Sequence, residues 1–223
     1  PQPVGLARPK EVDAYYVGFA GDGHFGRFNV THAFYHVFGQ EENNALATQD
    51  TNINAQFAAL EVSYDMDWIR FRVYGMYASG DDRPQDNDAE GFDAIMDAPN
   101  FAGGEFSYFN RQDVRLLGVG LTGRLSFLPD LTTNKFQGQA NFVNPGLLLL
   151  GAAVGVEITP TWRAQLGVNY MRFVHTESLE LYLEVEDVDR EIGTEIFFGT
   201  TFRPLLTNNI VINAGAAVLF PGD

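Results

Sequence analysis

One stretch of the chain, residues 146–173, sorts its side chains onto two faces with almost no exceptions. Every second position in residues 148–158 is Leu, Ala, Val or Ile, whereas positions 151, 153, 155 and 157 are Gly, Ala or Glu. The alternation resumes after a Thr-Pro-Thr turn at residues 159–161. A side-chain period of two indicates β-strands, so this stretch predicts a β-hairpin with one apolar and one polar face.

The polar face of this hairpin carries opposed charges. The register that pairs Ile158 with Trp162 also places Glu157 opposite Arg163. A carboxylate and a guanidinium group directly opposite each other stabilise an antiparallel pair, which supports this register.

A second hairpin is predicted at residues 55–77, around a short Asp-rich turn. Matching its apolar faces pairs Tyr64 with Ile69 and therefore places Glu61 opposite Arg72. The same pairing of opposite charges thus recurs on the polar face of a separate hairpin.

The polarity of the two faces bears on the environment of the sheet. A soluble β-sandwich would bury the apolar face in a core and turn the polar face to water. A transmembrane β-barrel would turn the apolar face to lipid and the polar face to a wet lumen, with aromatic residues near the strand ends. Aromatic residues near the ends of the first hairpin are Trp162, Tyr170 and Phe173. We therefore predict an antiparallel, up-and-down transmembrane β-barrel in a bacterial outer membrane.

Weaker alternation predicts further strands and brings the total to about ten. They are expected at residues 12–20, 27–38, 114–127, 135–143, 192–203 and 210–220. The Glu-rich residues 177–191 alternate only in part. We interpret them as strands that rise above the bilayer or as another pair of spanning segments.

The predicted turns alternate in length along the chain. Short turns are expected at residues 21–26, 65–68, 128–134, 159–161 and 204–209, and most connections between them are long or acidic. Asn144-Pro145-Gly146 is the exception, a tight turn among the long loops. Short turns at one rim and long loops at the other are typical of outer-membrane barrels. Both chain ends then lie at the long-loop rim, so we interpret residues 1–223 as one barrel domain that is a portion of a larger barrel.

Composition narrows the candidate functions. The chain has no run of about 18 apolar residues, so strands would have to cross a bilayer. It has no cysteine, which excludes disulfides and thiol catalysis. With 29 acidic and 14 basic residues its formal net charge is −15, which argues against nucleic acid as a partner. No GxSxG motif occurs and none of the 4 histidines lies in a recognisable catalytic motif, so we expect no enzymatic activity.

Charged and amide side chains on the polar faces would line the lumen of such a barrel. These candidates are Glu61, Arg70, Arg72, Arg124, Glu157, Arg163, Gln165, Asn169, Glu195 and Arg203. Opposed carboxylates and guanidinium groups in an open lumen would tune which ions or sugars pass. In a plugged lumen the same groups would merely satisfy one another.

Residues 78–113 form the longest unpatterned stretch, and it is strongly acidic. Four of its carboxylates approximate the spacing of a calcium loop, with glycine at the sixth position: Asp86, Asp88, Glu90 and Asp97. The last is Asp where such loops have Glu, and no flanking helices are predicted, so a solvated surface loop is the competing interpretation. Aromatic residues that follow, including Phe106, favour a loop that folds inward. Apart from Ca²⁺ we expect no cofactor.

Two groups of residues carry a resemblance to a known family. The first is Tyr77-Ala78-Ser79-Gly80-Asp81-Asp82 with Gly91-Phe92-Asp93-Ala94-Ile95, and the second runs from Ile192-Gly193-Thr194-Glu195 to Phe220-Pro221-Gly222-Asp223. With them, residues 77–223 resemble outer-membrane proteins of the alginate-export family. The resemblance implies a porin-like barrel that passes polysaccharide or small solutes.

Exporters of an anionic polymer in that family use an arginine-rich lumen. Here Glu61, Glu157 and Glu195 accompany the arginines on the polar faces, which leaves the substrate open. The alternative function is a structural or accessory barrel that scaffolds an outer-membrane assembly with protein partners. Lipid-facing and partner-facing apolar strips look alike in sequence, so both functions stay open.

Overall fold

The fold is built on one large β-sheet. The computed structural model describes residues 11–44, 46–93, 102–107, 115–116, 119–120, 141–206 and 209–222. The long strands are β1 (Val12–Phe25), β2 (Phe28–Glu41), β3 (Thr51–Met66), β4 (Ile69–Ala78), β8 (Leu147–Thr159), β9 (Trp162–Arg172), β10 (Glu191–Phe202) and β11 (Ile212–Pro221). The short strands are β5 (Asp88–Ala89), which pairs parallel with β3, and β6 (Arg115–Leu116) and β7 (Val119–Gly120), which pair with each other.

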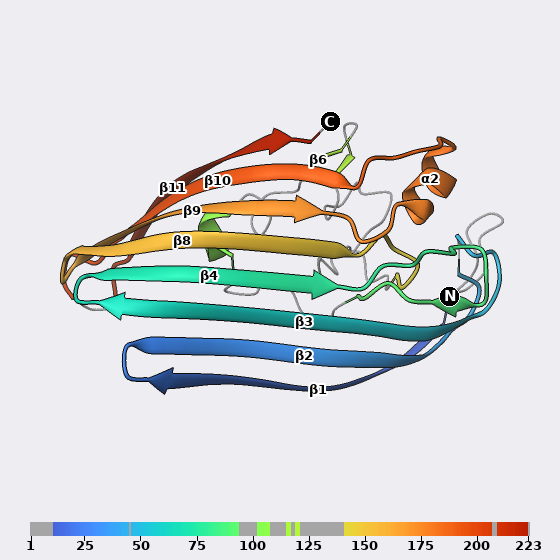
Figure 1. Ribbon diagram of the computed structural model, residues 1–223, viewed down its shortest axis with the longest axis horizontal. Coiled ribbons are helices and arrows are strands. Elements are labelled where there is room, and N and C mark those ends of the chain that lie inside the picture. The colour runs from blue at the N-terminus through green and yellow to red at the C-terminus, as the bar shows by residue number, and fades with distance from the viewer. Residues whose placement is uncertain are drawn as a thin grey trace.

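The long strands follow one another across the sheet in the order β1-β2-β3-β4-β8-β9-β10-β11 (Figure 1). Every pair of long neighbours is antiparallel. The predicted all-β, antiparallel, up-and-down architecture is therefore confirmed. Within the described residues the sheet is open, because β1 pairs only with β2 and β11 only with β10.

The connections differ between the two ends of the strands, as predicted. Short turns link β1 to β2, β3 to β4, β8 to β9, and β10 to β11 at the end of the sheet on the left of Figure 1. The longer connections and helix α2 (Glu177–Leu183) lie at the other end. We call these ends the short-turn rim and the long-loop rim. β1 begins and β11 ends at the long-loop rim.

β4 and β8 are direct neighbours, which corrects one prediction. They pair from Ile69 opposite Val156 to Ala78 opposite Leu147, so no strand from residues 114–143 separates them. The predicted strands at 114–127 and 135–143 lie mostly outside the described residues. Residues 141–146 are not strand, and Phe142 and Val143 are fully buried in the core beside the sheet. Asn144-Pro145-Gly146 is therefore not a hairpin turn.

The register of β8 and β9 confirms one predicted charge pair. Glu157 lies opposite Arg163. Trp162 pairs with Thr159 and not with the predicted Ile158, because Ile158 is an extra residue in a β-bulge.

The register of β3 and β4 differs from the prediction by two residues. Glu61 lies opposite Tyr74, and Arg72 lies opposite Ser63, so the predicted Glu61–Arg72 pair is wrong. The cause is a tighter turn, in which Asp67 adopts a left-handed conformation at φ 53°. A shift of two leaves every side chain on its predicted face, so alternation alone cannot reveal it.

Two local predictions fail where glycine and glutamate dominate the sequence. β1 continues to Phe25, and the turn to β2 is Gly26 and Arg27, not residues 21–26. Residues 177–183 of the Glu-rich stretch form α2 and not strands. Leu and Glu are good helix formers, and the carboxylates of the first turn favour a helix N-terminus.

The outer face of the sheet is apolar and exposed. We give this name to the face that no described loop covers. Its exposed side chains extend from Val17 (62% exposed) on β1 to Val218 (54%) on β11. Between them lie Phe34, Leu60, Val73, Leu150, Leu166, Val168, Ile196 and Phe198. Aromatic side chains occur near both rims, including Trp68 and Trp162 at the short turns and Tyr15 and Tyr77 at the other end.

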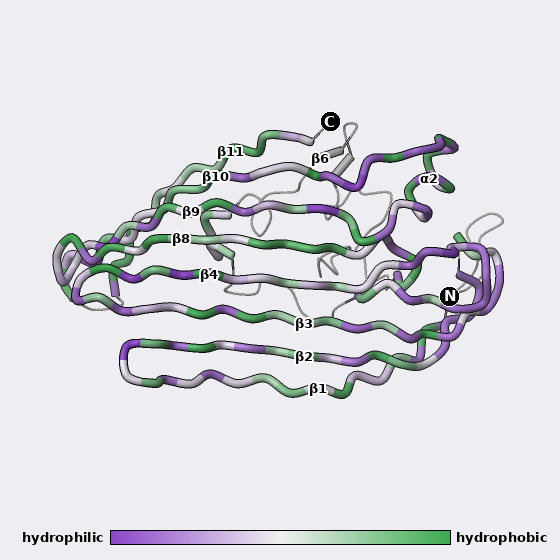
Figure 2. The backbone as a smooth tube through the Cα atoms, in the orientation of Figure 1, coloured by the Kyte–Doolittle hydropathy of each residue, from purple (hydrophilic) through white to green (hydrophobic). Residues whose placement is uncertain are grey.

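The buried core lies on the opposite face, which we call the inner face. Inward-facing residues of the strands pack there against residues of the long connections. The core includes Val37, Ile53, Met76, Leu149 and Phe197 from strands, and Phe92, Ala102, Phe142 and Leu179 from other segments. Figure 2 shows that β8 is hydrophobic along much of its length, whereas the loops at the long-loop rim are mostly hydrophilic. None of the helices in the described part of the chain is long and apolar enough to cross a membrane.

Candidate functional site

A charged cavity of about 780 Å³ lies on the inner face near the short-turn rim. β3, β4, β8, β9 and the connection from β10 to β11 contribute its lining. Seven of the predicted lumen residues line it: Glu61, Arg70, Arg72, Glu157, Arg163, Gln165 and Arg203. Alternation places them there because residues two apart on a strand share a face.

The charges around the cavity are balanced, unlike those of the chain as a whole. Four arginines line it, together with Glu61, Asp65, Asp67 and Glu157. Basic and acidic groups alternate across the sheet, because β3 supplies carboxylates, β4 arginines, β8 Glu157 and β9 Arg163. The cavity lining therefore carries no net charge, although the chain as a whole has a net charge of −15.

Some of these charged side chains are held in place by contacts near the short turns. Asp65 binds the guanidinium group of Arg70 through both carboxylate oxygens. Asn29 Nδ2 also donates to Asp65 Oδ2 at 2.9 Å, and the Asn29 side-chain oxygen lies 2.8 Å from His24 Nδ1. These polar contacts cross β1, β2, β3 and β4 in one row, so they hold the four strands together at the mouth of the cavity.

Three other arginines, Arg72, Arg163 and Arg203, line the cavity. Arg72 Nη1 donates to Gln165 Oε1 at 3.2 Å, and the register places Arg163 opposite Glu157. The buried Nε of Arg203 has no hydrogen-bond partner among the described residues. Guanidinium groups of this kind suit carboxylates, phosphates and sugar hydroxyls, because each offers several planar donors.

Residues 102–107, which we call the inner segment, wall off the cavity on its long-loop side. The segment contains η1 (Gly104–Phe106), and it lies against the inner faces of β9 and β10. Gln165 Nε2 donates to Gly103 O at 3.3 Å, and Asn169 Nδ2 donates to Ala102 O at 3.0 Å. The prediction of a loop that folds inward near Phe106 is therefore confirmed for these residues.

The predicted lumen residues Asn169 and Glu195 hold the inner segment and do not line the cavity. Both are fully buried. Glu195 Oε2 accepts a hydrogen bond from Ser107 Oγ at 3.1 Å and another from Asn169 Nδ2 at 3.3 Å. The Tyr74 hydroxyl donates to Asn169 Oδ1 at 2.7 Å. This buried polar cluster ties the segment to β4, β9 and β10 at once.

Glycines on the inner face make room for the inner segment. An added Cβ at Gly199 would lie 2.2 Å from the ring of Phe106, and one at Gly215 would lie 2.4 Å from it. The ring therefore lies flat on β10 and β11. A Cβ at Gly103 would lie 2.7 Å from the ring of Phe197. Sequence alternation alone gave no sign that these glycines serve packing, because small residues on the inner face also fit a narrow lumen.

The predicted calcium loop shows no metal cluster in its described part. Asp86 Oδ2 lies 3.3 Å from Arg83 Nη1, and Asp86 Oδ1 accepts the backbone N–H of Asp88. The described residues contain no group of three or more metal-ligating side chains placed to hold an ion. Asp97 and the predicted lumen residue Arg124 lie outside the described residues. Calcium binding by Asp86, Asp88, Glu90 and Asp97 stays a prediction.

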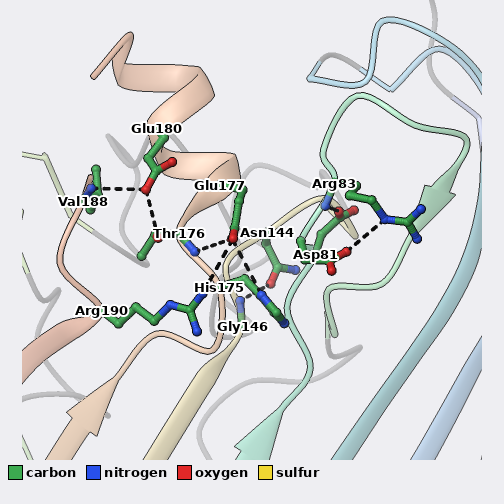
Figure 3. A network of polar contacts seen from close by, with 11 residues as sticks. Asp81, Arg83, Asn144, Gly146, His175, Thr176, Glu177, Glu180, Val188 and Arg190 are labelled. Atoms are coloured by element: carbon green, nitrogen blue, oxygen red, sulfur yellow. Dashed lines mark hydrogen bonds and ion pairs between the residues drawn. The ribbon is translucent and has the colours of Figure 1, made fainter. Parts of the chain in front are cut away.

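A second polar network orders the long-loop rim (Figure 3). The buried carboxylate of Asp81 accepts a hydrogen bond from the backbone N–H of Arg83 at 2.9 Å. The backbone N–H of Asp81 donates to the carbonyl oxygen of Asn144. Asn144 in turn accepts the Gly146 N–H at 2.9 Å and donates to Phe92 O at 3.2 Å. Burial raises the pKa of Asp81 to about 6.

Helix α2 joins the same rim through its first turn. Glu177 accepts the backbone N–H of Thr176 at 2.8 Å and lies 3.6 Å from the guanidinium group of Arg190. The backbone N–H groups of Val174 and His175 both donate to Pro145 O. The segment around Asn144 is therefore held from both sides, by the loop after β4 and by the loop before α2.

Comparisons with known proteins add no family to this description. No protein-family model matches the chain, and no curated protein matches it.

Proposed function

We propose that this chain forms the wall of an outer-membrane channel, of the porin-like kind that the alginate-export resemblance implies, for small solutes or polysaccharide. The observation that carries the proposal is the apolar outer face. A water-soluble protein rarely exposes a contiguous apolar patch of more than a few hundred Å². Here apolar side chains are exposed on all eight long strands, which are 10 to 16 residues long. Strands of that length suffice to cross a bilayer when tilted.

The inner face supports a solute pathway. Its cavity is lined by arginines, carboxylates and amide groups, which can bind the hydroxyl and carboxylate groups of polar solutes. The exposed guanidinium group of Arg163 suits hydroxyl or carboxylate groups of a sugar. Neutral sugars and short uronate oligomers are thus the solutes that this lining fits best.

A structural or accessory barrel is the second candidate, and one observation favours it. The long-loop half of the inner face is filled by buried side chains of the core, and the inner segment closes the cavity on that side. A pathway therefore requires the inner segment to move or the solute to pass beside it. In a scaffold the same filling would simply stabilise the barrel.

Reconstitution into liposomes distinguishes the two functions. The channel proposal predicts swelling with neutral disaccharides and with uronate oligomers, decreasing as the solutes grow. Insertion is checked by flotation of the liposomes, and liposomes with heat-denatured protein are the matched control. Inserted protein that gives neither swelling nor conductance would exclude a channel and support the accessory role. Protein that does not float with the lipid would exclude the membrane location itself.

A further inference from the structure

The two tryptophans of the chain both lie at the short-turn rim, but in different surroundings. Trp162 shares the outer face of β9 with Leu166 and Val168, and its indole Nε1 donates to Thr200 Oγ1 at 2.6 Å. Trp68 lines the cavity on the inner face and is 59% exposed. Within the described part of the chain, no side chain hydrogen-bonds to its indole N–H or stacks on its ring. A girdle at the bilayer surface explains Trp162, but it does not explain an indole in the wall of the cavity.

Trp68 is the first of five residues that form one row across neighbouring strands (Figure 1). Its carbonyl oxygen accepts the backbone N–H of Glu157 at 2.8 Å, so Trp68 and Glu157 lie side by side on β4 and β8. Glu157 lies opposite Arg163 on β9, which in turn lies opposite Thr201 on β10. Thr201 lies opposite Asn213 on β11. We call these five residues the rim row, and all five line the cavity.

The polar groups of the rim row are open to the cavity. Glu157, Arg163 and Asn213 are exposed, and Thr201 is half-buried. Their side chains form no hydrogen bond with any other described residue. Gly155, which precedes Glu157 by two residues on the same face, also lines the cavity and adds no side chain. The space beside the row is therefore available to a solute.

The row combines an apolar face with groups of complementary hydrogen-bonding character. The indole of Trp68 offers a large flat apolar surface and one N–H donor. Glu157 only accepts hydrogen bonds and Arg163 only donates them, whereas the side chains of Thr201 and Asn213 do both. A pyranose ring has the matching surface, because its C–H groups form flat apolar faces and its hydroxyls, which both donate and accept, lie around the edge.

We propose that the rim row is a binding site for a neutral sugar. The pyranose ring stacks on the indole of Trp68, and its hydroxyls bind Glu157, Arg163 and Thr201. The inference rests on the proposed channel function and deepens it, because it chooses one of the two solute classes given there and assigns the residues that hold it.

The order of charges in the row excludes an anionic sugar as the preferred ligand. Glu157 and Arg163 lie directly opposite each other. A uronate carboxylate bound to Arg163 would therefore lie near the carboxylate of Glu157, and since it only accepts hydrogen bonds it would leave Glu157 without a donor. A pair of neighbouring hydroxyls satisfies both side chains at once.

The length of the row suits more than one ring. Neighbouring strands lie about 4.8 Å apart, so the five residues extend over roughly 19 Å of the sheet. We therefore choose a neutral disaccharide, maltose, as the probe.

Tryptophan fluorescence of the full chain in detergent tests the site, because the chain has only 2 tryptophans. Trp162→Phe leaves Trp68 as the single tryptophan, and its emission should change saturably as maltose is added. Trp68→Phe leaves Trp162 and is the matched control at the same rim, in which maltose should cause no change. Sorbitol, an open-chain polyol without a ring face, should cause no saturable change in either variant. Digalacturonate should bind the Trp162→Phe variant more weakly than maltose does.

A change at Arg163 tests the polar part of the row. In the Trp162→Phe background, Arg163→Met keeps the length of the side chain but removes its donors, and it should raise the dissociation constant of maltose roughly tenfold. Arg83→Met, in the exposed loop at the other rim, should leave that constant unchanged.

Four results would overturn the proposal. They are the lack of a saturable response to maltose in Trp162→Phe, an equal response in Trp68→Phe, an equal response to sorbitol, and tighter binding of digalacturonate than of maltose. The binding measurement does not depend on transport, so the two proposals can fail separately. Maltose binding without liposome swelling would contradict only the channel function, whereas swelling without saturable binding would contradict only the site.

Discussion

The ring of Phe106 lies directly on the backbone of Gly199, where an added Cβ would come within 2.2 Å of it. Gly199→Ala should therefore push the inner segment away from β10. Overpacking of this kind typically costs about 1 to 3 kcal/mol of stability. We expect a lower thermal midpoint in detergent and, if the inner segment narrows the pathway, a higher single-channel conductance.

The matched control for this change is Gly155→Ala, also on the inner face. Its added Cβ would meet Arg72 Nη2 at an ordinary 3.4 Å, so stability and conductance should stay close to those of the parent. Phe106→Ala removes the clash, so Gly199→Ala should cost little in that background. Equal midpoints for Gly199→Ala and the parent would show that the inner segment does not pack there.

A charge on the outer face should block membrane assembly. Ile196 on β10 is 46% exposed and faces outward, whereas Thr201 on the same strand lines the cavity. Arginine at the midplane of a lipid-facing strand costs about 2 to 4 kcal/mol. Ile196→Arg should therefore reduce the amount of folded protein in outer membranes, and Thr201→Arg should not. Similar yields of the two variants would count against a lipid-facing outer face.

Reversal of two cavity charges should change ion selectivity. Arg72→Glu combined with Arg163→Glu turns a balanced lining into an acidic one, which favours cations. In planar bilayers under a salt gradient, the reversal potential should shift towards that of a cation-selective channel, more strongly at low ionic strength. Arg83→Glu reverses one charge in an exposed loop at the other rim and should leave the potential nearly unchanged. An unshifted potential in the double variant would indicate that ions do not pass this cavity.

The long-loop rim should be more stable at mildly acidic pH. Burial raises the pKa of Asp81 to about 6, above the value of about 3.9 for an unfolded chain. The folded protein therefore binds this proton more tightly, so the favourable contribution is complete below pH ~4 and is lost as the pH rises through about 6. The change is on the order of 1 kcal/mol after allowance for solvent screening.

Thermal unfolding in detergent between pH 4.5 and 7.5 checks this contribution. Asp81→Asn cannot ionise, so the stability of the parent relative to this variant should fall as the pH rises from 4.5 to about 6 and should level off above that pH. Asp82→Asn, in the same loop but more exposed, serves as the control. A constant difference between Asp81→Asn and the parent across this range would show that Asp81 does not titrate there.

The sequence by itself determined the location of most long strands and the face on which their side chains lie. Alternation at residues 146–173 located β8 and β9, and it placed Glu157 opposite Arg163. It also placed Arg72, Gln165 and the other cavity residues on the inner face, because the two-residue period of a strand depends only on the chain's own order. The alternation of short and long connections likewise gave the up-and-down topology.

Only the tertiary structure decided features that depend on contacts between distant segments. The alternation is compatible with Glu61 opposite Arg72 and equally with Glu61 opposite Tyr74, because a register shift of two residues leaves every side chain on the same face of the sheet. The geometry of the turn between β3 and β4 selects the pairing with Tyr74. Asn169 and Glu195 looked like open lumen positions, yet the inner segment buries both. A strand pattern records which side of the sheet a residue faces, but it carries no information about which other segment of the chain will cover that side.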